Sequence, residues 1–478
     1  MNLLDGMKIK NYKINTKGSK YYSNTYDSNL DVFTMLSRYN PTDEIIQKFE
    51  NALQEDKTLA LANLLYILDI RNGKGERLIF KTIYKYLCNN YPDEALKILP
   101  HIKELGRYDY ILEGINTKIE EQTMNIIKTQ LKEDINSETL SLLAKWLPSH
   151  RTHNENNNLA KIIRKKLNMT EKKYRKTLSE LRKKLNIVEK NLSTKKYDRI
   201  DFSKVPTKAM LKYTEAYNRH MKEQYEKYKE SVNKGVTKIN TTGLFAYEIV
   251  KKILWGMPCD EELYDLMWKN QKNIFENQDA NILVVADTSG SMTNYNGIPY
   301  ATSVGLALYT AERNKGIFKN HFITFSENPI LQEVKGTTIK QKIDNIESIV
   351  ANTDIDKVFE LILTTAIENK LKQKDIPSHI IIISDMEFDQ GVYTKEGTNF
   401  EGWKKEFQEK NYKLPTIIFW NVAAFTQGVP TTKYENDVAL ISGFSTNILE
   451  NILTLDNYSP IDVMKEKLSP YIEMLGDN

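Results

Sequence analysis

The feature that most restricts the fold of this 478-residue chain is a series of short apolar runs in its C-terminal part. The runs are ILVVAD (282–287), HFITFS (321–326), HIIIIS (379–384), TIIFWNV (416–422) and VALIS (438–442). They are continuous and rich in β-branched residues, which is typical of strands that are buried on both faces. Helical stretches are expected between them, over 298–313, 338–350 and 355–370. The pattern predicts an α/β domain over residues 273–478, with a parallel sheet covered by helices on both sides.

The preceding residues, 30–272, have a helical pattern almost throughout. Apolar residues fill most positions of TLALANLLYILDIR (58–71), as in a buried helix. Further along, one stripe of an amphipathic helix is formed by Tyr174, Leu178, Leu181, Leu185 and Val188. Short helices joined by short polar turns favour helix pairs stacked as a HEAT-like solenoid. Residues 1–29 are expected to form an N-terminal extension.

The composition excludes several classes of protein. Apolar residues make up 40% and charged residues 27% of the chain, which suits a folded globular protein rather than a disordered one. No stretch reaches the roughly 18 apolar residues of a membrane span, and the first residues lack the apolar core of a secretion signal. Cys88 and Cys259 are too few for a disulfide framework or a cysteine zinc site. We therefore expect a cytoplasmic protein without a membrane partner.

Five oxygen-bearing side chains are expected to meet at one edge of the predicted sheet. Three follow the first strand in the sequence DTSGS, one precedes the helix expected from residue 355, and one follows the strand 379–384. Ligands of α/β sheets bind at the carboxyl ends of the strands, and hard oxygen donors suit Mg²⁺ or Mn²⁺. The candidate metal ligands are Asp287, Ser289, Ser291, Thr353 and Asp385.

The motif DTSGS also occurs in settings other than a metal site. Ser, Thr and Asp are also common at the N-cap of a helix, so the motif alone is compatible with a capping turn. A haloacid-dehalogenase-type phosphatase has a second Asp at the position of Ser289, and Ser cannot act as its acid or base. A serine hydrolase needs a histidine beside its nucleophile, whereas His321 and His379 are expected at strand starts. We therefore predict no catalytic residues, with a metal-dependent phosphoesterase as a less favoured alternative.

The order DxSxS, Thr and Asp in this strand context resembles the metal-ion-dependent adhesion site of von Willebrand factor A domains, over residues 273–478. The resemblance implies a Rossmann-like α/β fold. It implies that Ser289, Ser291 and Thr353 would give hydroxyl oxygens to the metal. Asp287 and Asp385 would then act largely through bound water. A sixth metal position would accept an acidic group from a protein ligand.

The helical half carries a second resemblance. The segments DIRNGKGER (69–77) and ELGRYDYIL (104–112) resemble the helical repeats of Ro-type (TROVE) RNA-binding proteins, in which a ring of helix pairs precedes an A domain. Five further segments are AKWLPS (144–149), LRKKLNIVEKNLS (181–193), FSKVPTKAMLKY (202–213), SDMEFD (384–389) and ISGFS (441–445). They resemble an uncharacterised family of plant, bacterial and viral proteins with the same architecture, over nearly the whole chain. That resemblance implies an architecture more than an activity, whereas the Ro-type one implies RNA as a partner.

A basic segment strengthens the case for RNA. Residues 161–200 contain 15 Lys and Arg but only four Asp and Glu, a net charge of +11, whereas the whole chain has a charge of +4. Such a segment can neutralise phosphates, and its Tyr174 and Tyr197 can stack on bases; a solvated helix face is the alternative. The candidate RNA-binding residues are Arg71, Lys74 and Arg77 at a helix–helix turn, and Lys172, Lys173, Arg175, Lys176, Arg182, Lys183 and Lys184 in the basic segment.

Together these observations predict a non-enzymatic scaffold of the ribonucleoprotein type. Its helical domain would bind RNA, and its A domain would bind an acidic protein ligand through Mg²⁺ or Mn²⁺. The alternative is a metal-dependent protein–protein adaptor that binds no RNA.

Overall fold

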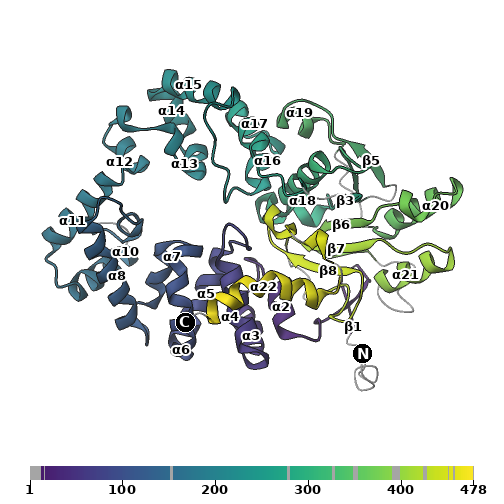
Figure 1. Cartoon of the computed structure of the whole chain (residues 1–478), viewed down its shortest axis with the longest axis horizontal. Helices are drawn as coiled ribbons and strands as arrows, with labels where there is room; N and C mark the ends of the chain where they lie inside the picture. Colours follow the sequence, from purple (N-terminus) through teal and green to yellow (C-terminus); the bar gives the residue numbers. More distant parts are fainter. Residues whose placement is uncertain are drawn as a thin grey trace. The chain divides into compact units, whose positions relative to one another are not determined.

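The computed structural model describes residues 12–15, 17–150, 154–276, 280–325, 329–347, 354–389, 399–423, 428–450, 452–455 and 458–476. This part of the chain is mostly helical, with a six-stranded sheet towards the C-terminus (Figure 1). The chain divides into two compact units. Unit 1 contains Met1–Ile67, Arg71–Ile79 and Gly243–Asp477, and unit 2 contains Leu68–Ile70, Phe80–Thr242 and Asn478. The predicted domain boundaries after residues 29 and 272 stay predictions.

The sheet of unit 1 has the strand order β5-β4-β3-β6-β7-β8. Its strands are β3 (Ile282–Ala286), β4 (His321–Thr324), β5 (Ile330–Glu333), β6 (His379–Ser384), β7 (Thr416–Asn421) and β8 (Val438–Ser442). Neighbouring strands are parallel except β4 and β5, so the predicted parallel sheet is found with one addition, the antiparallel edge strand β5, which was not predicted. The chain proceeds outward from β3 through β4 and β5, then places β6 on the other side of β3. The β3–β6 pair is therefore the switch point of the sheet, where α/β folds bind ligands.

Helices cover both faces of this sheet. Helix α18 (Asn294–Arg313) contacts β3, β4 and β6, and helices α20 (Asp356–Glu368) and α21 (Asn399–Glu409) bury the opposite face. On the second face Leu283 and Ile382 share a hydrophobic core with Phe359 and Trp403, whose rings stack with centroids 4.0 Å apart. Side chains alternate between the two faces of a strand, and helices cover both faces here. Strands β3 and β6 are therefore buried on both sides, as their continuous apolar sequences predict.

Segments from the N-terminal third complete unit 1. They are the hairpin β1 (Tyr12–Ile14) and β2 (Lys20–Tyr22), and helices α2 (Ser28–Met35), α3 (Thr42–Glu55) and α4 (Lys57–Leu68). Helix α2 contacts β8 and the last helix, α22 (Pro460–Gly476). The remaining helices of the unit are α16 (Ala246–Leu254), α17 (Glu261–Lys269) and α19 (Ile339–Asp344). The sheet is thus packed against helices from both ends of the sequence.

Unit 2 is helical. Its helices are α5 (Arg77–Asn90, with its first turn in unit 1), α6 (Pro92–Ile98), α7 (Ile102–Leu105), α8 (Glu120–Asn136), α9 (Leu143–Trp146), α10 (Asn154–Lys166), α11 (Glu171–Lys184), α12 (Val188–Ser193), α13 (Thr207–Lys212), α14 (Thr214–His220) and α15 (Lys222–Asn233). Helices α8, α9 and α11 contact one another, as do α14 and α15. The predicted stripe of α11 is buried at Tyr174, Leu178 and Leu181. None of the helices in the described ranges has the length and apolar character needed to cross a bilayer.

Candidate functional site

Asp287 and Asp385 lie at the switch point of the sheet, one residue beyond the ends of β3 and β6. Both side chains are fully buried. The backbone N–H of Asp287 donates to the carbonyl of Ile383 (2.9 Å), which extends the β3–β6 pairing to the first carboxylate. The backbone N–H of Glu387 donates to Oδ1 of Asp385 (3.0 Å). The two predicted carboxylates therefore come together, as the carboxyl ends of neighbouring parallel strands require.

The serines of DTSGS surround the first carboxylate. The backbone N–H of Ser289 donates to Oδ1 of Asp287 (2.9 Å), and the hydroxyls of Ser289 and Ser291 lie 3.0 Å apart. Ser291 also forms a side-chain hydrogen bond with Asp385. This connects the DTSGS loop after β3 with the loop after β6. Four of the five predicted metal residues thus form one cluster, whereas Thr353 lies outside the described residues.

The electrostatics of the cluster suit a cation. Burial, and then the negative charge of Asp385, raise the pKa of Asp287 to about 7. Burial also raises the pKa of Asp385, against hydrogen bonds from Ser291 and the backbone of Glu387. Two neighbouring buried carboxyl groups are both ionised only when a cation balances their charge; otherwise one of them keeps its proton. In the described ranges, no three His, Cys, Asp or Glu side chains group as a metal site, so a cation here would depend on the serine hydroxyls as well.

Two residues near this cluster were not predicted from the sequence. Ser384, the last residue of β6, donates to Oδ2 of Asp287 (2.6 Å) and accepts from the backbone N–H of Met386 (3.0 Å). Lys17, beyond β1, donates to the carbonyl of Glu387 (3.0 Å), and its charge lowers the pKa of Asp385. The position of Ser384 directly before Asp385 was a usable signal, but no local pattern links Lys17 to the loop after β6.

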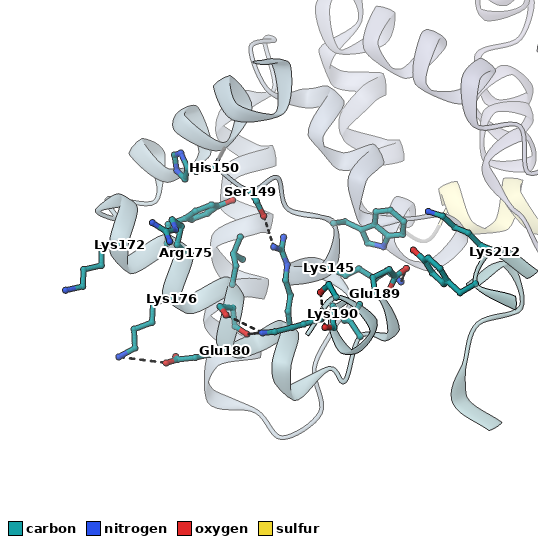
Figure 2. Close-up of a pocket in the computed structure, with 18 residues that line it drawn as sticks. Lys145, Ser149, His150, Lys172, Arg175, Lys176, Glu180, Glu189, Lys190 and Lys212 are labelled. Atoms are coloured by element: carbon teal, nitrogen blue, oxygen red, sulfur yellow. Dashed lines mark hydrogen bonds and ion pairs between the residues drawn. The ribbon is translucent and has the colours of Figure 1, made fainter. Parts of the chain in front are cut away.

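A second candidate site is a cavity of about 1380 Å³ in unit 2, which we call the basic cavity (Figure 2). Its described wall carries seven Lys and Arg but only two Glu. The cations are Lys145, Lys172, Arg175, Lys176, Arg182, Lys190 and Lys212, and the acids are Glu180 and Glu189. Trp146 and Tyr213 line the same cavity. The excess of positive charge makes the basic cavity suited to an anionic ligand.

Two of these cations are held by neutral groups. The guanidinium of Arg182 donates to the carbonyls of Ala144 and Leu147 and to the hydroxyl of Ser149, all at 2.7 Å. The ammonium of Lys190 donates to the carbonyl of Ser179 (2.6 Å). Burial, and then the charges of Arg182 and other cations, lower the pKa of Lys190. The wall therefore has an excess of positive charge that a bound anion would offset.

The structure separates the predicted RNA-binding residues. Lys172, Arg175, Lys176 and Arg182 line the basic cavity together. Lys173, Lys183 and Lys184 are exposed beside it on α11, and Arg71 and Arg77 are exposed in unit 1. Lys145, Lys190 and Lys212 join the cavity wall without having been predicted, since Lys145 and Lys212 lie outside the basic segment and Lys190 was not singled out within it.

Two of the predicted nucleic-acid contacts were wrong. The side chain of Lys74 is 1% exposed, and its ammonium donates to the carbonyl of Phe33 and to the hydroxyl of Ser442. Tyr174 is fully buried, and its hydroxyl donates to the carbonyl of Pro148 (2.9 Å). Both side chains are held inside the protein, so neither reaches a phosphate or a base.

Comparison with known proteins finds relatives without a stated activity. Residues 281–469 match a domain of unknown function (DUF7788), and residues 119–292 match another domain of unknown function (DUF2828). The chain is 28% identical over 509 aligned residues to Uncharacterized protein L728 of Acanthamoeba polyphaga mimivirus, covering 97% of this chain and 88% of the viral protein. The predicted similarity to a viral protein over nearly the whole chain is thus found. The resemblances to Ro-type proteins and to A domains stay predictions.

Proposed function

We propose that the chain is a non-enzymatic scaffold whose strand-end cluster holds Mg²⁺ or Mn²⁺ and docks an acidic group of a protein partner, as in a von Willebrand factor A domain. The supporting observation is the pair of buried carboxylates, Asp287 and Asp385, joined by serine hydroxyls at the switch point of the sheet. A divalent cation would balance the two negative charges in this dry position. Ser289 and Ser291 would supply neutral oxygen ligands to the cation.

The neutral ligands explain why an acidic partner is favoured. A cation held mostly by hydroxyl groups keeps much of its positive charge, because hydroxyls donate less electron density than carboxylates. An incoming carboxylate therefore completes the coordination shell and offsets the remaining charge. In this mechanism the protein performs no bond-breaking step; it presents the cation and fixes the direction of approach.

The test is calorimetric titration of the full chain with Mg²⁺ and with Mn²⁺. The Ser289→Ala and Ser291→Ala double variant is expected to lose the binding heat while its thermal unfolding midpoint stays close to that of the unchanged protein. Thr293→Ala is the matched control, because this hydroxyl lies on the same loop but donates to the carbonyl of Gly290 (2.7 Å). Unchanged titration of the double variant would refute the metal assignment. Hydrolysis of a simple phosphoester with added Mg²⁺, abolished by Asp287→Ala, would instead favour the phosphoesterase.

The basic cavity supports a second function of the scaffold, RNA binding. Seven cations against two acids around one cavity form a site for a polyanion, and Lys-rich contacts to phosphates give salt-sensitive binding of low sequence specificity. Binding of a labelled RNA, measured by fluorescence anisotropy across a salt series, is the direct test. The Lys172→Ala and Lys176→Ala double variant is expected to flatten the dependence of affinity on salt by about 1.4 in log–log slope.

The matched control for that double variant lies on α8. Lys128 and Lys132 are exposed in unit 2 but do not line the basic cavity, so replacing both with Ala should change the slope much less. Equal effects of the two double variants would mean that RNA is attracted by the general charge of the surface. No binding at low salt would remove RNA from the proposed function and leave the protein–protein adaptor.

A further inference from the structure

The cations of the basic cavity are spread along it rather than gathered at one point. In Figure 2, Lys172 and Lys176 lie towards one end, Lys190 lies near the middle, and Lys212 lies at the other end. A compact anion, such as one phosphate, is bound best by cations that converge on a single position. A row of cations suits a chain of regularly spaced negative charges.

One cation of the cavity is recessed in its wall. Its most firmly held cation, Arg182, is half-buried and is fixed by three hydrogen bonds to the 144–149 segment. A double helix presents its phosphates on a wide, rigid cylinder, which would meet the exposed Lys172 and Lys176 more readily than the half-buried Arg182. A flexible single strand can bring a phosphate to Arg182.

Aromatic side chains line the same cavity as the cations. Trp146 and Tyr213 are both partly exposed, and the guanidinium of Arg107 lies 3.8 Å from the centre of the Trp146 ring. The ammonium of Lys212 lies 5.1 Å from the centre of the Tyr213 ring. Unpaired bases stack on aromatic faces, whereas the bases of a duplex are already stacked on one another. An acidic peptide would use the cations but would gain little from these rings.

We propose that the basic cavity is a binding site for single-stranded RNA, in which the backbone follows the row of cations past Lys190 and Arg182 and a base stacks on Tyr213 or Trp146. The inference rests on the proposed RNA binding and deepens it, because it names the form of RNA and the residues that select it. The cations and rings of the cavity that the charge pattern of the sequence did not single out are Lys145, Lys190, Lys212, Trp146 and Tyr213.

The experiment compares two forms of one RNA with the full chain. A labelled oligouridine is titrated alone and then annealed to oligoadenosine, at the same salt concentration, with affinity read by fluorescence anisotropy. The single strand is expected to bind at least about tenfold more tightly. Tyr213→Leu is expected to weaken single-strand binding about fivefold or more, while Tyr213→Phe, which keeps the ring, stays within about twofold.

Controls separate a lost contact from a damaged fold. Tyr86→Leu changes a partly exposed tyrosine of unit 2 that does not line the basic cavity, and it should leave both affinities unchanged. Circular dichroism and the thermal midpoint of Tyr213→Leu should match those of Tyr213→Phe. Should Tyr213→Leu unfold, Trp146→Phe against Trp146→Leu provides the same comparison on the other ring.

The outcomes are distinguishable. Preference for the single strand that depends on the Tyr213 ring supports the inference. Equal binding of both forms, with no effect of Tyr213→Leu, overturns it while RNA binding stands. Competition by polyglutamate as strong as that by oligouridine overturns it in favour of an acidic-protein site. No binding of either RNA at low salt removes RNA binding altogether, and the inference with it.

Discussion

The hydroxyl of Ser384 donates a hydrogen bond of 2.6 Å to Oδ2 of Asp287, so the last residue of β6 supports the first carboxylate after β3. The same hydroxyl accepts from the backbone N–H of Met386, whose φ of +67° lies in the left-handed region that few non-glycine residues adopt. Ser384 thus fixes both the Asp287 carboxylate and the turn after Asp385. Ser384 is therefore a positioning residue of the candidate metal site, because it orients Asp287 and the turn at Met386.

Removal of this hydroxyl should weaken the metal site without removing a ligand. Ser384→Ala is expected to lower Mg²⁺ affinity about tenfold, because supporting residues of metal ligands typically account for 10- to 100-fold in affinity. Calorimetric titration measures the change. Ser442→Ala is the control, since it removes the equivalent strand-end hydroxyl of β8, which bonds to Phe33 instead. Equal loss of affinity in both variants would contradict the assigned role.

In the absence of metal, the buried carboxylates should make the folded protein less stable as the pH rises. Because the folded-state pKa of Asp287 is raised from 3.8 to about 7, the folded protein binds the proton more tightly than the unfolded chain. This group's contribution to stability is therefore present below pH 4, falls as the pH rises from about 4 to 7, and is fully lost above pH 7. The free energy of unfolding lost through Asp287 across this pH range is at most about 4 kcal/mol.

Thermal unfolding in EDTA and in Mg²⁺ tests this prediction. In EDTA, Asp287→Asn should raise the unfolding midpoint more at pH 8 than at pH 5. In the unchanged protein, Mg²⁺ should raise the midpoint more at pH 8, because protons no longer compete with the cation. A stabilisation by Mg²⁺ that is equal at both pH values would show that the cation does not bind at these carboxylates.

Lys74 makes a separate pH prediction in unit 1. Burial lowers the pKa of its ammonium to about 7, partly opposed by the charge of Glu76. The unfolded chain therefore binds the proton more tightly between pH 7 and 10.5, and stability rises with pH across this window. Lys74→Met should remove that rise and stabilise the protein at pH 7, by an amount on the order of a few kcal/mol.

The Lys74→Met variant should not leave the partners of the lysine without hydrogen bonds, because they also bond to each other. The hydroxyl of Ser442 also donates to the carbonyl of Phe33 (3.0 Å), so this buried carbonyl stays satisfied without the ammonium. Denaturant unfolding midpoints at pH 7 and pH 9.5 provide the measurement. A midpoint that rises with pH as much in the variant as in the unchanged protein would assign the effect to other groups.

Replacing Arg182 should change the local dynamics of the 144–149 segment. Its three hydrogen bonds to Ala144, Leu147 and Ser149 use the planar fork of the guanidinium, which a lysine cannot reproduce. Arg182→Lys keeps the charge but should speed hydrogen exchange of the 144–149 backbone several-fold, with little change in α8. Mass-spectrometric exchange of the full chain measures both segments. Exchange that is faster throughout unit 2 would mean a general loss of stability.

Much of the sheet could be predicted because its strands are uniform in character. HIIIIS and VALIS mark β6 and β8 at their observed bounds, since a run of β-branched and apolar residues has few other stable uses. β5 was missed because Ile330 and Leu331 are exposed on a short edge strand, where sequence and burial are weakly linked. The meeting of Asp287 and Asp385 followed from one rule about strand ends.

Long-range contacts set the limit of sequence reasoning at the two sites. Lys74 lies between glycines in a polar turn and reads as exposed, but α2 and β8 enclose it from distant parts of the chain. Tyr174 fits both a core stripe and a stacking position, and only its bond to Pro148 decides between them. Trp146 and Tyr213 carry no local signal of a shared cavity because 67 positions separate them.

The contact between α2 and β8 also affects the order in which parts of the chain can fold during synthesis. The hydroxyl of Ser442 meets the carbonyl of Phe33 across 409 positions, and the whole of Phe80–Thr242 belongs to the other compact unit. On the ribosome, α2 therefore emerges long before β8, and until then it can pack only on the helices that follow it closely, such as α3 and α4. The helices of residues 80–242 can finish folding during that time, so a nascent chain would contain a complete unit 2 before the C-terminal strands of unit 1 have been made.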